Sequence, residues 1–251
     1  MPRLFATLIA LTIFLTGSAM AQAEKPTSIV LVHGAFVDAS GWRATYDALT
    51  KDGYEVLLVQ NPTLSLKGDV DATARVIARA KHPVVLVGHS YGGMVITEAG
   101  NNPKVKSLVY LAAYAPDAGE TVVSLSKPVP GEPGAPLLPP SDGYLLVDQA
   151  KFPAAFAAGA DKSLATFMAA SQVPWGIEAV ETKIAVPAWK SKPTFFMVTA
   201  KDMMIPPTTQ RMMAKRTGGK VVEIASSHAV MLTFPQDVVK FIESADVSIN
   251  Q

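Results

Sequence analysis

The chain of 251 residues contains no cysteine. This absence excludes disulfide bonds, cysteine nucleophiles and a cysteine-linked lipid anchor, so the fold has to rely on its apolar core. The four histidines show neither the His-x-x-x-His nor the His-Glu spacing that is typical of metal sites. A Gly-x-Gly-x-x-Gly turn after the first expected strand is also missing, which argues against a dinucleotide. We therefore expect no metal and no cofactor.

Charge is also scarce. Charged residues make up 17% of the chain, against roughly 25% in an average soluble domain. The formal net charge of +1 gives no electrostatic basis for a nucleic-acid partner. One small basic group is interpreted as the solvated face of a helix and the residues after it: Arg211, Lys215, Arg216 and Lys220. We expect a small molecule as the partner, and the sequence leaves the oligomeric state open.

The first residues have the pattern of an export signal. An apolar run of thirteen residues, Leu4 to Thr16, follows Arg3 and is shorter than the roughly 20 residues that span a bilayer. Small residues at 19, 21 and 23 then offer two cleavage sites. We expect residues 1–23 to be a signal peptide and residues 24–251 to form one domain. The mature protein is expected to be periplasmic or secreted, without a membrane anchor.

Six short segments rich in β-branched residues predict the strands of a sheet. Several are continuously apolar, which is typical of strands covered on both faces in a parallel sheet. The expected strands are 28–32, 55–59, 83–88, 105–111, 194–198 and 220–224. The main helical segments between and after them are 41–51, 69–80, 94–99, 207–216 and 236–244. This alternation predicts the α/β class, with a doubly wound, mostly parallel six-stranded sheet.

One stretch, from about 117 to 190, interrupts the alternation. Six prolines fall between 128 and 140, so residues 127–143 cannot form a regular helix or strand. Short helical pieces are expected after this loop, at 149–158 and 163–170. We interpret the whole stretch as a helical cap insertion that lies over the carboxyl edge of the sheet.

The segment Gly88-His89-Ser90-Tyr91-Gly92 follows the third expected strand and precedes a helix. In that context, Gly-x-Ser-x-Gly is typical of a nucleophilic serine at a tight strand-to-helix turn. Small residues at 88 and 92 relieve crowding, so the hydroxyl projects above the sheet. The helix N-terminus favours the negative charge that develops nearby. We predict Ser90 as the nucleophile; for this motif alone, a glycine-rich turn with a bystander serine is the alternative.

An acid and a base follow later strands. Asp202 comes after the fifth expected strand and His228 after the sixth, and the carboxyl ends of such strands meet at one edge of the sheet. A serine hydroxyl needs a neutral imidazole to take its proton and a buried carboxylate to orient that imidazole. The sequence therefore predicts His228 as the base and Asp202 as the acid. Asp117, after the fourth expected strand, remains the alternative acid.

Two backbone amides are candidates for binding an oxyanion. One belongs to Tyr91, directly after the predicted nucleophile, and the other to the loop that ends the first expected strand. In that loop we predict Phe36 as the donor, with Ala35 as the alternative. His33, at the start of the loop, is interpreted as a structural histidine that holds it by hydrogen bonds.

These motifs resemble those of the α/β-hydrolase superfamily, within it the branch of plant methylesterases, hydroxynitrile lyases and bacterial esterases. The resemblance covers essentially the whole mature chain and rests on residues 32–36, 41–42, 88–93, 114–117 and 228–233. It implies a mostly parallel sheet with a helical cap, which the stretch at 117–190 fits.

Two departures from the resembled enzymes narrow the chemistry. Lyases of this branch carry a lysine directly after the triad histidine, where this chain has Ala229, so cyanohydrin cleavage is disfavoured. A serine at position 90, rather than an aspartate, disfavours dehalogenase and epoxide-hydrolase chemistry. We expect hydrolysis of a carboxylic ester of a small molecule through an acyl-enzyme.

Alternatives to ester hydrolysis remain open on the sequence alone. They are perhydrolysis or C–C bond hydrolysis by the same triad, and a non-catalytic relative that binds a ligand. Large apolar residues of the cap are candidates for lining a substrate pocket or for plain core packing: Phe152, Phe156, Phe167, Met168 and Trp175.

Overall fold

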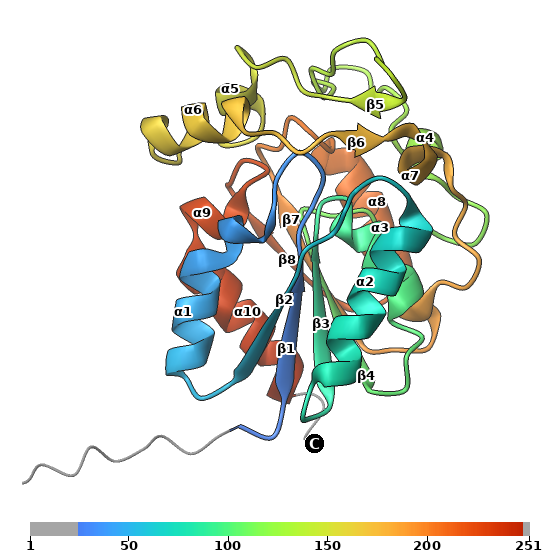
Figure 1. The fold of residues 1–251 in the computed structure, drawn as a ribbon, viewed down its shortest axis with the longest axis vertical. Coiled ribbons are helices and arrows are strands. Elements are labelled where there is room, and N and C mark those ends of the chain that lie inside the picture. Colours follow the sequence, from blue (N-terminus) through green and yellow to red (C-terminus); the bar gives the residue numbers. More distant parts are fainter. Residues whose placement is uncertain (1–24, 248–251) are drawn as a thin grey trace, which may run out of the picture.

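A computed structural model describes residues 25–247, so the expected signal peptide at 1–23 lies outside the described residues. Its centre is a sheet of six parallel strands in the order β2-β1-β3-β4-β7-β8 (Figure 1). The strands are β1 (Ser28–Val32), β2 (Glu55–Val59), β3 (Val84–His89), β4 (Val105–Leu111), β7 (Thr194–Thr199) and β8 (Lys220–Ile224). All six expected strands are present to within one residue at each end, and the predicted parallel sheet is confirmed.

Helices cover both faces of this sheet. Helices α1 (Arg43–Lys51) and α10 (Pro235–Val247) lie on one face, and α2 (Leu66–Arg79) and α3 (Gly92–Ala99) on the other (Figure 1). Helix α8 (Pro207–Thr217) packs on β7. Every residue of β1, β3 and β7 is buried, which explains why these strands are continuously apolar. The doubly wound arrangement is therefore also confirmed.

The strand order reverses between β1 and β3, because the chain first adds β2 on one side of β1 and then β3 on the other. The loops that follow β1 and β3 therefore flank a crevice at the carboxyl edge, where open α/β sheets bind ligands. None of the described helices is long and apolar enough to cross a membrane.

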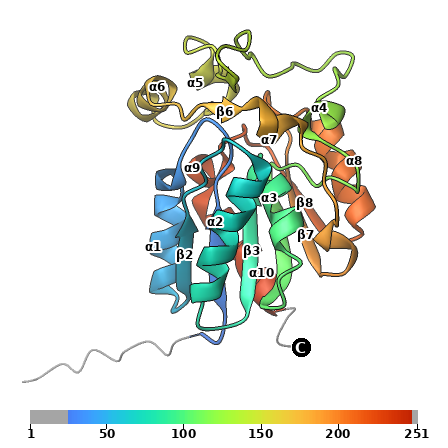
Figure 2. The same ribbon diagram turned by 45° about the vertical axis from the view of Figure 1, so that its right-hand side comes forward.

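Between β4 and β7 the chain leaves the sheet and forms a cap above its carboxyl edge (Figures 1 and 2). The cap elements are α4 (Val122–Leu125), β5 (Tyr144–Leu145), α5 (Phe152–Ala155), α6 (Lys162–Ala170), β6 (Trp175–Gly176) and α7 (Ile177–Glu181). Strands β5 and β6 pair in antiparallel fashion, a small sheet that the sequence did not predict. The predicted cap is present, and it provides a roof over the crevice.

Three shorter helices complete the fold: η1 (Ala39–Trp42), η2 (Ala188–Lys190) and α9 (Val230–Thr233). The helix expected at 149–158 is wrong, because α5 is a single turn at Phe152–Ala155. A helix starting at 149 would need an amide hydrogen at Pro153, which proline lacks. Gly159, with φ of 89°, then turns the chain away from a helical path.

Candidate active site

Ser90 occupies a tight turn between β3 and α3 in a backbone conformation that is rare outside glycine. Its φ of 56° lies in the left-handed region, which costs a non-glycine residue about 1–3 kcal/mol. The amide of Ser90 donates to the carbonyl of Leu111 at 3.2 Å, and its carbonyl accepts from the amides of Gly93 and Tyr114 at 3.0 and 3.1 Å. Helix α3 and the end of β4 therefore hold the strained turn in place.

The glycines of the turn are required by close backbone approach. A Cβ atom on Gly88 would lie 2.7 Å from the carbonyl oxygen of Gly92. A Cβ atom on Gly92 would lie 2.7 Å from the carbonyl oxygen of Val32, at the end of β1. The geometry thus supplies the crowding that small residues at 88 and 92 were predicted to relieve.

The predicted acid and base contact each other at the same edge. His228 Nδ1 lies 2.8 Å from Asp202 Oδ2, and both side chains are buried. Because Nδ1 bonds to the carboxylate, Nε2 is the ring nitrogen that is left for a second hydrogen bond. This Nε2 atom is buried and has no hydrogen-bond partner within residues 25–247. Nε2 is therefore free to accept a further hydrogen bond, and catalytic hydrogen bonds often form only once a substrate binds.

His89 joins the loop of the base to the turn of the nucleophile. Its Nε2 atom donates to the carbonyl of His228 at 3.0 Å, and the two rings lie 4.7 Å apart. Burial, followed by the nearness of His228, holds the pKa of His89 well below its usual value. His89 is therefore neutral and positions the backbone of His228.

Four further donors hold the Asp202 carboxylate. Thr199 Oγ1 and Gln210 Nε2 each donate to Oδ2 at 2.8 Å. The amides of Met204 and Ile205 donate to Oδ1 at 2.7 and 3.0 Å. With His228 as the fifth donor, the carboxylate is fixed in one orientation. Gln210, a buried polar residue inside α8, was not predicted, because no local pattern marks it.

Asp117, the alternative acid, lies at the surface beside Lys190. The ammonium of Lys190 is 2.5 Å from its Oδ1 atom, and this hydrogen bond holds the pKa of Asp117 below its usual range. The structure thus brings Asp202, rather than Asp117, to His228.

The two predicted oxyanion donors come from two different loops: Phe36 lies in the loop after β1, and Tyr91 directly follows Ser90. Phe36 has φ of 68°, and it lines the same cavity as Ala35 and Ser90. Tyr91 directly precedes the first turn of α3. Neither the Phe36 amide nor the Tyr91 amide donates to another residue within 25–247. Neither amide is therefore occupied by a hydrogen bond within the described part of the chain.

His33 holds the loop that carries Phe36. Its Nδ1 atom donates to the carbonyl of Gly34 at 2.8 Å, and its Nε2 atom accepts from the amide of Asn61 at 2.9 Å. The side chain of Asn61 returns a bond to the carbonyl of His33 at 3.0 Å. With both ring nitrogens occupied and its pKa lowered by burial, His33 has a structural role.

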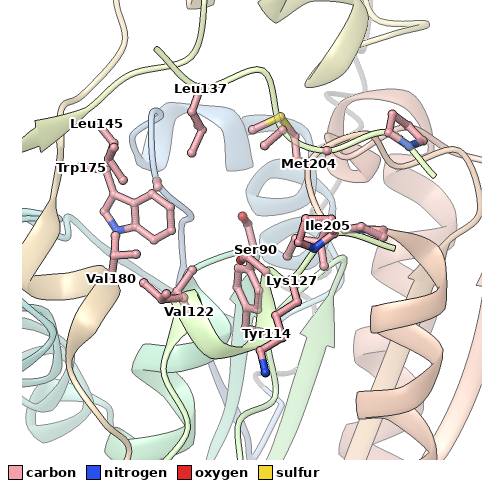
Figure 3. Close-up of a pocket in the computed structure, with 18 of the residues that line it drawn as sticks. Ser90, Tyr114, Val122, Lys127, Leu137, Leu145, Trp175, Val180, Met204 and Ile205 are labelled. Carbon is pink, nitrogen blue, oxygen red and sulfur yellow. The ribbon is translucent and has the colours of Figure 1, made fainter. Parts of the chain in front are cut away.

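A cavity of about 400 Å³ opens above Ser90 (Figure 3). Trp175 forms one wall, Met204 and Ile205 face it, and Leu137 lies above. Two charged residues, Lys127 and Glu132, are among the lining residues. The Lys127 ammonium points away from Ser90 (Figure 3), and the Glu132 carboxylate accepts hydrogen bonds from Thr208. The cavity suits an uncharged, apolar ligand, because a charged group would lose its hydration there.

Of the five large cap residues singled out from the sequence, Trp175 lines this cavity. Phe152 and Phe156 are buried in the core, and the Phe156 ring lies edge-on to the His228 ring with centroids 4.8 Å apart. Phe167 is 68% exposed, and Met168 borders a separate small cavity. Core packing was the alternative for each of the five residues, and it is what Phe152 and Phe156 do. No group of three potential ligands that could hold a metal ion occurs within residues 25–247.

Comparison with known proteins gives one family. The model of the Alpha/beta hydrolase family matches residues 29–241. The carbendazim hydrolyzing esterase of Nocardioides sp. (strain SG-4G) is 37% identical over 123 residues, which are 43% of this chain and 51% of that protein. This match therefore spans about half of that relative. Alpha/beta hydrolase nvfD of Aspergillus novofumigatus is 27% identical over 244 residues, covering 88% of this chain and 96% of that protein.

Solved structures share the same fold. The pyrethroid hydrolase from Sphingobium faniae JZ-2 superposes with a TM-score of 0.74 at 23% identity, covering 90% of this chain and 100% of that one. A methylesterase from Arabidopsis gives 0.73 at 20% identity, covering 88% and 99%. At these identities the likeness concerns the fold, and the plant branch expected from the sequence is among the structural neighbours.

Proposed function

Because the chain belongs to the alpha/beta hydrolase family, we propose that it is a serine hydrolase that cleaves carboxylic esters through an acyl-enzyme. The observation that carries this proposal is the bond of 2.8 Å between His228 Nδ1 and Asp202 Oδ2, which leaves Nε2 as an unpartnered acceptor. His89 ties this pair to the turn that carries Ser90. The names of two relatives, an esterase and a pyrethroid hydrolase, support the same reaction class.

The first half of the proposed reaction acylates the enzyme. Ser90 Oγ attacks the ester carbonyl carbon while its proton passes to His228 Nε2. The carbonyl oxygen becomes an anion and accepts hydrogen bonds from the amides of Phe36 and Tyr91. When the tetrahedral intermediate collapses, the C–O bond to the leaving group breaks. His228 gives the proton to that oxygen, and the alcohol departs.

The second half repeats these steps with water. His228 takes a proton from the water as it attacks the acyl carbon, and the same two amides bind the second oxyanion. Collapse breaks the bond to Ser90 Oγ, which regains the proton, and the carboxylic acid leaves. Asp202 keeps the imidazole in one tautomer and stabilises the imidazolium that forms in each half. Each oxyanion donor contributes about 10²–10³-fold to the rate.

The apolar walls of the cavity support uncharged esters as the substrate class. A volume of about 400 Å³ lies within the range of ordinary small-molecule pockets. A free carboxylate or ammonium on the substrate would find no paired charge beside Trp175, Met204 or Ile205 and would be costly to bury there.

Export is a separate part of the proposal, carried by the apolar run and small residues within 1–23. The mature protein is expected in the periplasm or the medium. Amino-terminal sequencing of protein from those fractions should show cleavage near residue 21 or 23, and an uncleaved cytoplasmic protein would contradict export.

Replacement of the nucleophile tests the reaction. Ser90→Ala should reduce kcat on short p-nitrophenyl esters by about a million-fold, because loss of a triad serine disables the whole triad. Ser244→Ala, on the remote helix α10, is the control and should keep wild-type turnover. Full activity of Ser90→Ala would refute the assignment. A fluorophosphonate that fails to label Ser90 in the folded protein would instead favour a non-catalytic binding protein.

A further inference from the structure

A second buried carboxylate lies against the nucleophile turn, outside the triad. Asp69, in the first turn of α2, has no exposed surface. Its Oδ1 atom accepts from the amide of Thr63 at 2.8 Å, and its Oδ2 atom accepts from the hydroxyl of Tyr91 at 2.6 Å. Two neutral donors therefore hold a carboxyl group that has no charged partner within the described residues.

A buried carboxyl group without a charged partner destabilises the fold. Removing a carboxylate from water without a cation costs several kcal/mol, and replacement by apolar residues is often neutral or stabilising. Burial accordingly raises the pKa of Asp69 to about 6, against the opposing effect of its bonds to Tyr91 and Thr63. A buried carboxyl group that destabilises the fold in this way points to a role in the site next to it.

The bond to Tyr91 connects Asp69 directly to one proposed oxyanion donor. Tyr91 follows Ser90, its side chain is fully buried, and its ring lies 5.2 Å from the ring of Trp175. A tyrosine has two side-chain torsions, so a fixed hydroxyl and a packed ring leave its Cα little freedom. The direction of the Tyr91 amide is thereby restricted as well.

The bond to Thr63 connects Asp69 to the cap. Thr63 has φ of 59°, a strained value for a β-branched residue, and its amide is held by Asp69. Its carbonyl accepts from the amide of Gly176 at 2.9 Å, and its hydroxyl lies 2.9 Å from the carbonyl of Pro174. Thr63 therefore fastens both ends of the short segment that carries Trp175.

Trp175 completes the path to the second donor. Its ring meets the ring of Phe36 edge-on, with centroids 5.4 Å apart. The cap also holds Phe36 by its backbone, because the Phe36 carbonyl accepts from the amide of Val173 at 3.3 Å. The strand that Thr63 fastens is thus the element that packs on the loop of the Phe36 amide.

We propose that Asp69 is a positioning residue that holds both oxyanion donors, Tyr91 through its hydroxyl and Phe36 through Thr63 and Trp175. Asp69 itself touches no reacting atom. The inference rests on the proposed function, and it assigns to this carboxyl the geometry of the oxyanion site rather than a proton-transfer step.

Kinetics and transition-state mimicry test the proposal. In Asp69→Asn and Tyr91→Phe, kcat on a short p-nitrophenyl ester should fall about tenfold, because losing a donor outright costs about 10²–10³-fold and a misplaced donor costs less. KM should stay within about twofold, since the donors act on the transition state. The affinity for an alkyl boronic acid, which forms a tetrahedral adduct with Ser90, should fall by the same factor as kcat/KM.

Tyr54→Phe is the matched control for loss of a buried hydrogen bond. The Tyr54 hydroxyl donates to Asp246 Oδ2 at 3.0 Å, so it too pairs a buried tyrosine with a buried carboxyl. Tyr54 directly precedes β2 and lies at the amino edge of the sheet, away from the cavity. This variant should lower Tm as Tyr91→Phe does, while kcat and boronate affinity stay at the wild-type level.

The double variant Asp69→Asn/Tyr91→Phe tests whether Asp69 and Tyr91 affect catalysis through one shared contact or independently of each other. If Asp69 acts through Tyr91, the combined loss in kcat should be well below the product of the single losses. A drop in Tm for Asp69→Asn with unchanged kcat and boronate affinity would overturn the proposal. Failure of the proposed function would appear earlier, as wild-type protein without turnover that depends on Ser90.

Discussion

Asp69 makes the stability of the fold depend on pH in an unusual direction. Burial raises its pKa from 3.8 to about 6 in the folded protein, whereas in the unfolded chain the value returns to near 3.9. Between these values the folded state binds more protons than the unfolded state. The free energy of unfolding therefore falls as the pH rises through this window. A salt-bridged carboxyl would have the opposite effect.

The size of this effect follows from the two pKa values. A rise from 3.8 to about 6 corresponds to about 3 kcal/mol at about 1.36 kcal/mol per pH unit. The contribution is fully present below pH 3.8 and is lost as the pH rises through 6. For a domain whose total stability is about 5–15 kcal/mol, such a change is large.

Substitution by asparagine isolates this one group. Asp69→Asn keeps the size and the acceptor oxygen but removes the titration. Urea unfolding followed by tryptophan fluorescence, at intervals from pH 4 to 7.5, gives the unfolding free energy of both proteins. We expect the wild type to lose about 2 kcal/mol relative to the variant across this range, because part of the total is already lost at pH 4. A constant difference at all pH values would refute the reasoning, because the carboxyl would then titrate alike in both states.

Three further predictions concern the site. Asp202→Asn should lower kcat about 10⁴-fold, because the amide favours the wrong tautomer of the His228 imidazole, and should also lower Tm, because its NH2 group would face buried donors that now bond to the carboxylate; a kcat loss below tenfold would contradict its role as the acid. Gly92→Ala should lower both Tm and turnover, since its Cβ would lie 2.7 Å from a carbonyl oxygen, whereas Gly41→Ala, with nothing within 4 Å, should change neither. Leu137→Asp should reduce kcat/KM for apolar esters at least about tenfold by placing a charge on the cavity wall, and Leu138→Asp, outside the lining, is its control; equal effects would contradict the proposed apolar pocket.

The sheet, the Ser90 turn and the pairing of Asp202 with His228 could be predicted because their signals are local. The six segments rich in β-branched residues are the six strands, and burial on both faces explains the apolar runs of the central strands β1, β3 and β7. Ser90 is marked by the glycines that its turn requires. Asp202 and His228 each follow a strand directly, so strand prediction alone places them at one edge.

The cavity and its supports could not be predicted because they depend on packing between distant segments. Asp69 meets Tyr91 only because α2 packs on α3, and nothing in the local sequence of either helix indicates the bond. Gln210 contacts Asp202 because of the face of helix α8 on which its side chain lies. Trp175 lines the cavity, whereas Phe167 is exposed. This difference depends on how the cap packs, and no periodic pattern in the sequence indicates it.

The cap has a consequence for how this enzyme can change over generations. Much of the apolar wall of the cavity belongs to the insertion between β4 and β7: Val122, Leu137, Leu145, Trp175 and Val180. The proposed nucleophile, acid and base follow β3, β7 and β8, outside that insertion. Substitutions at Leu137, Leu145 and Val180 can therefore change the choice of substrate while the reaction persists, whereas Trp175 also packs on Phe36. A directed-evolution library at these three positions would vary the cavity wall without changing the contacts that the cap makes with Phe36 and the loop of His228.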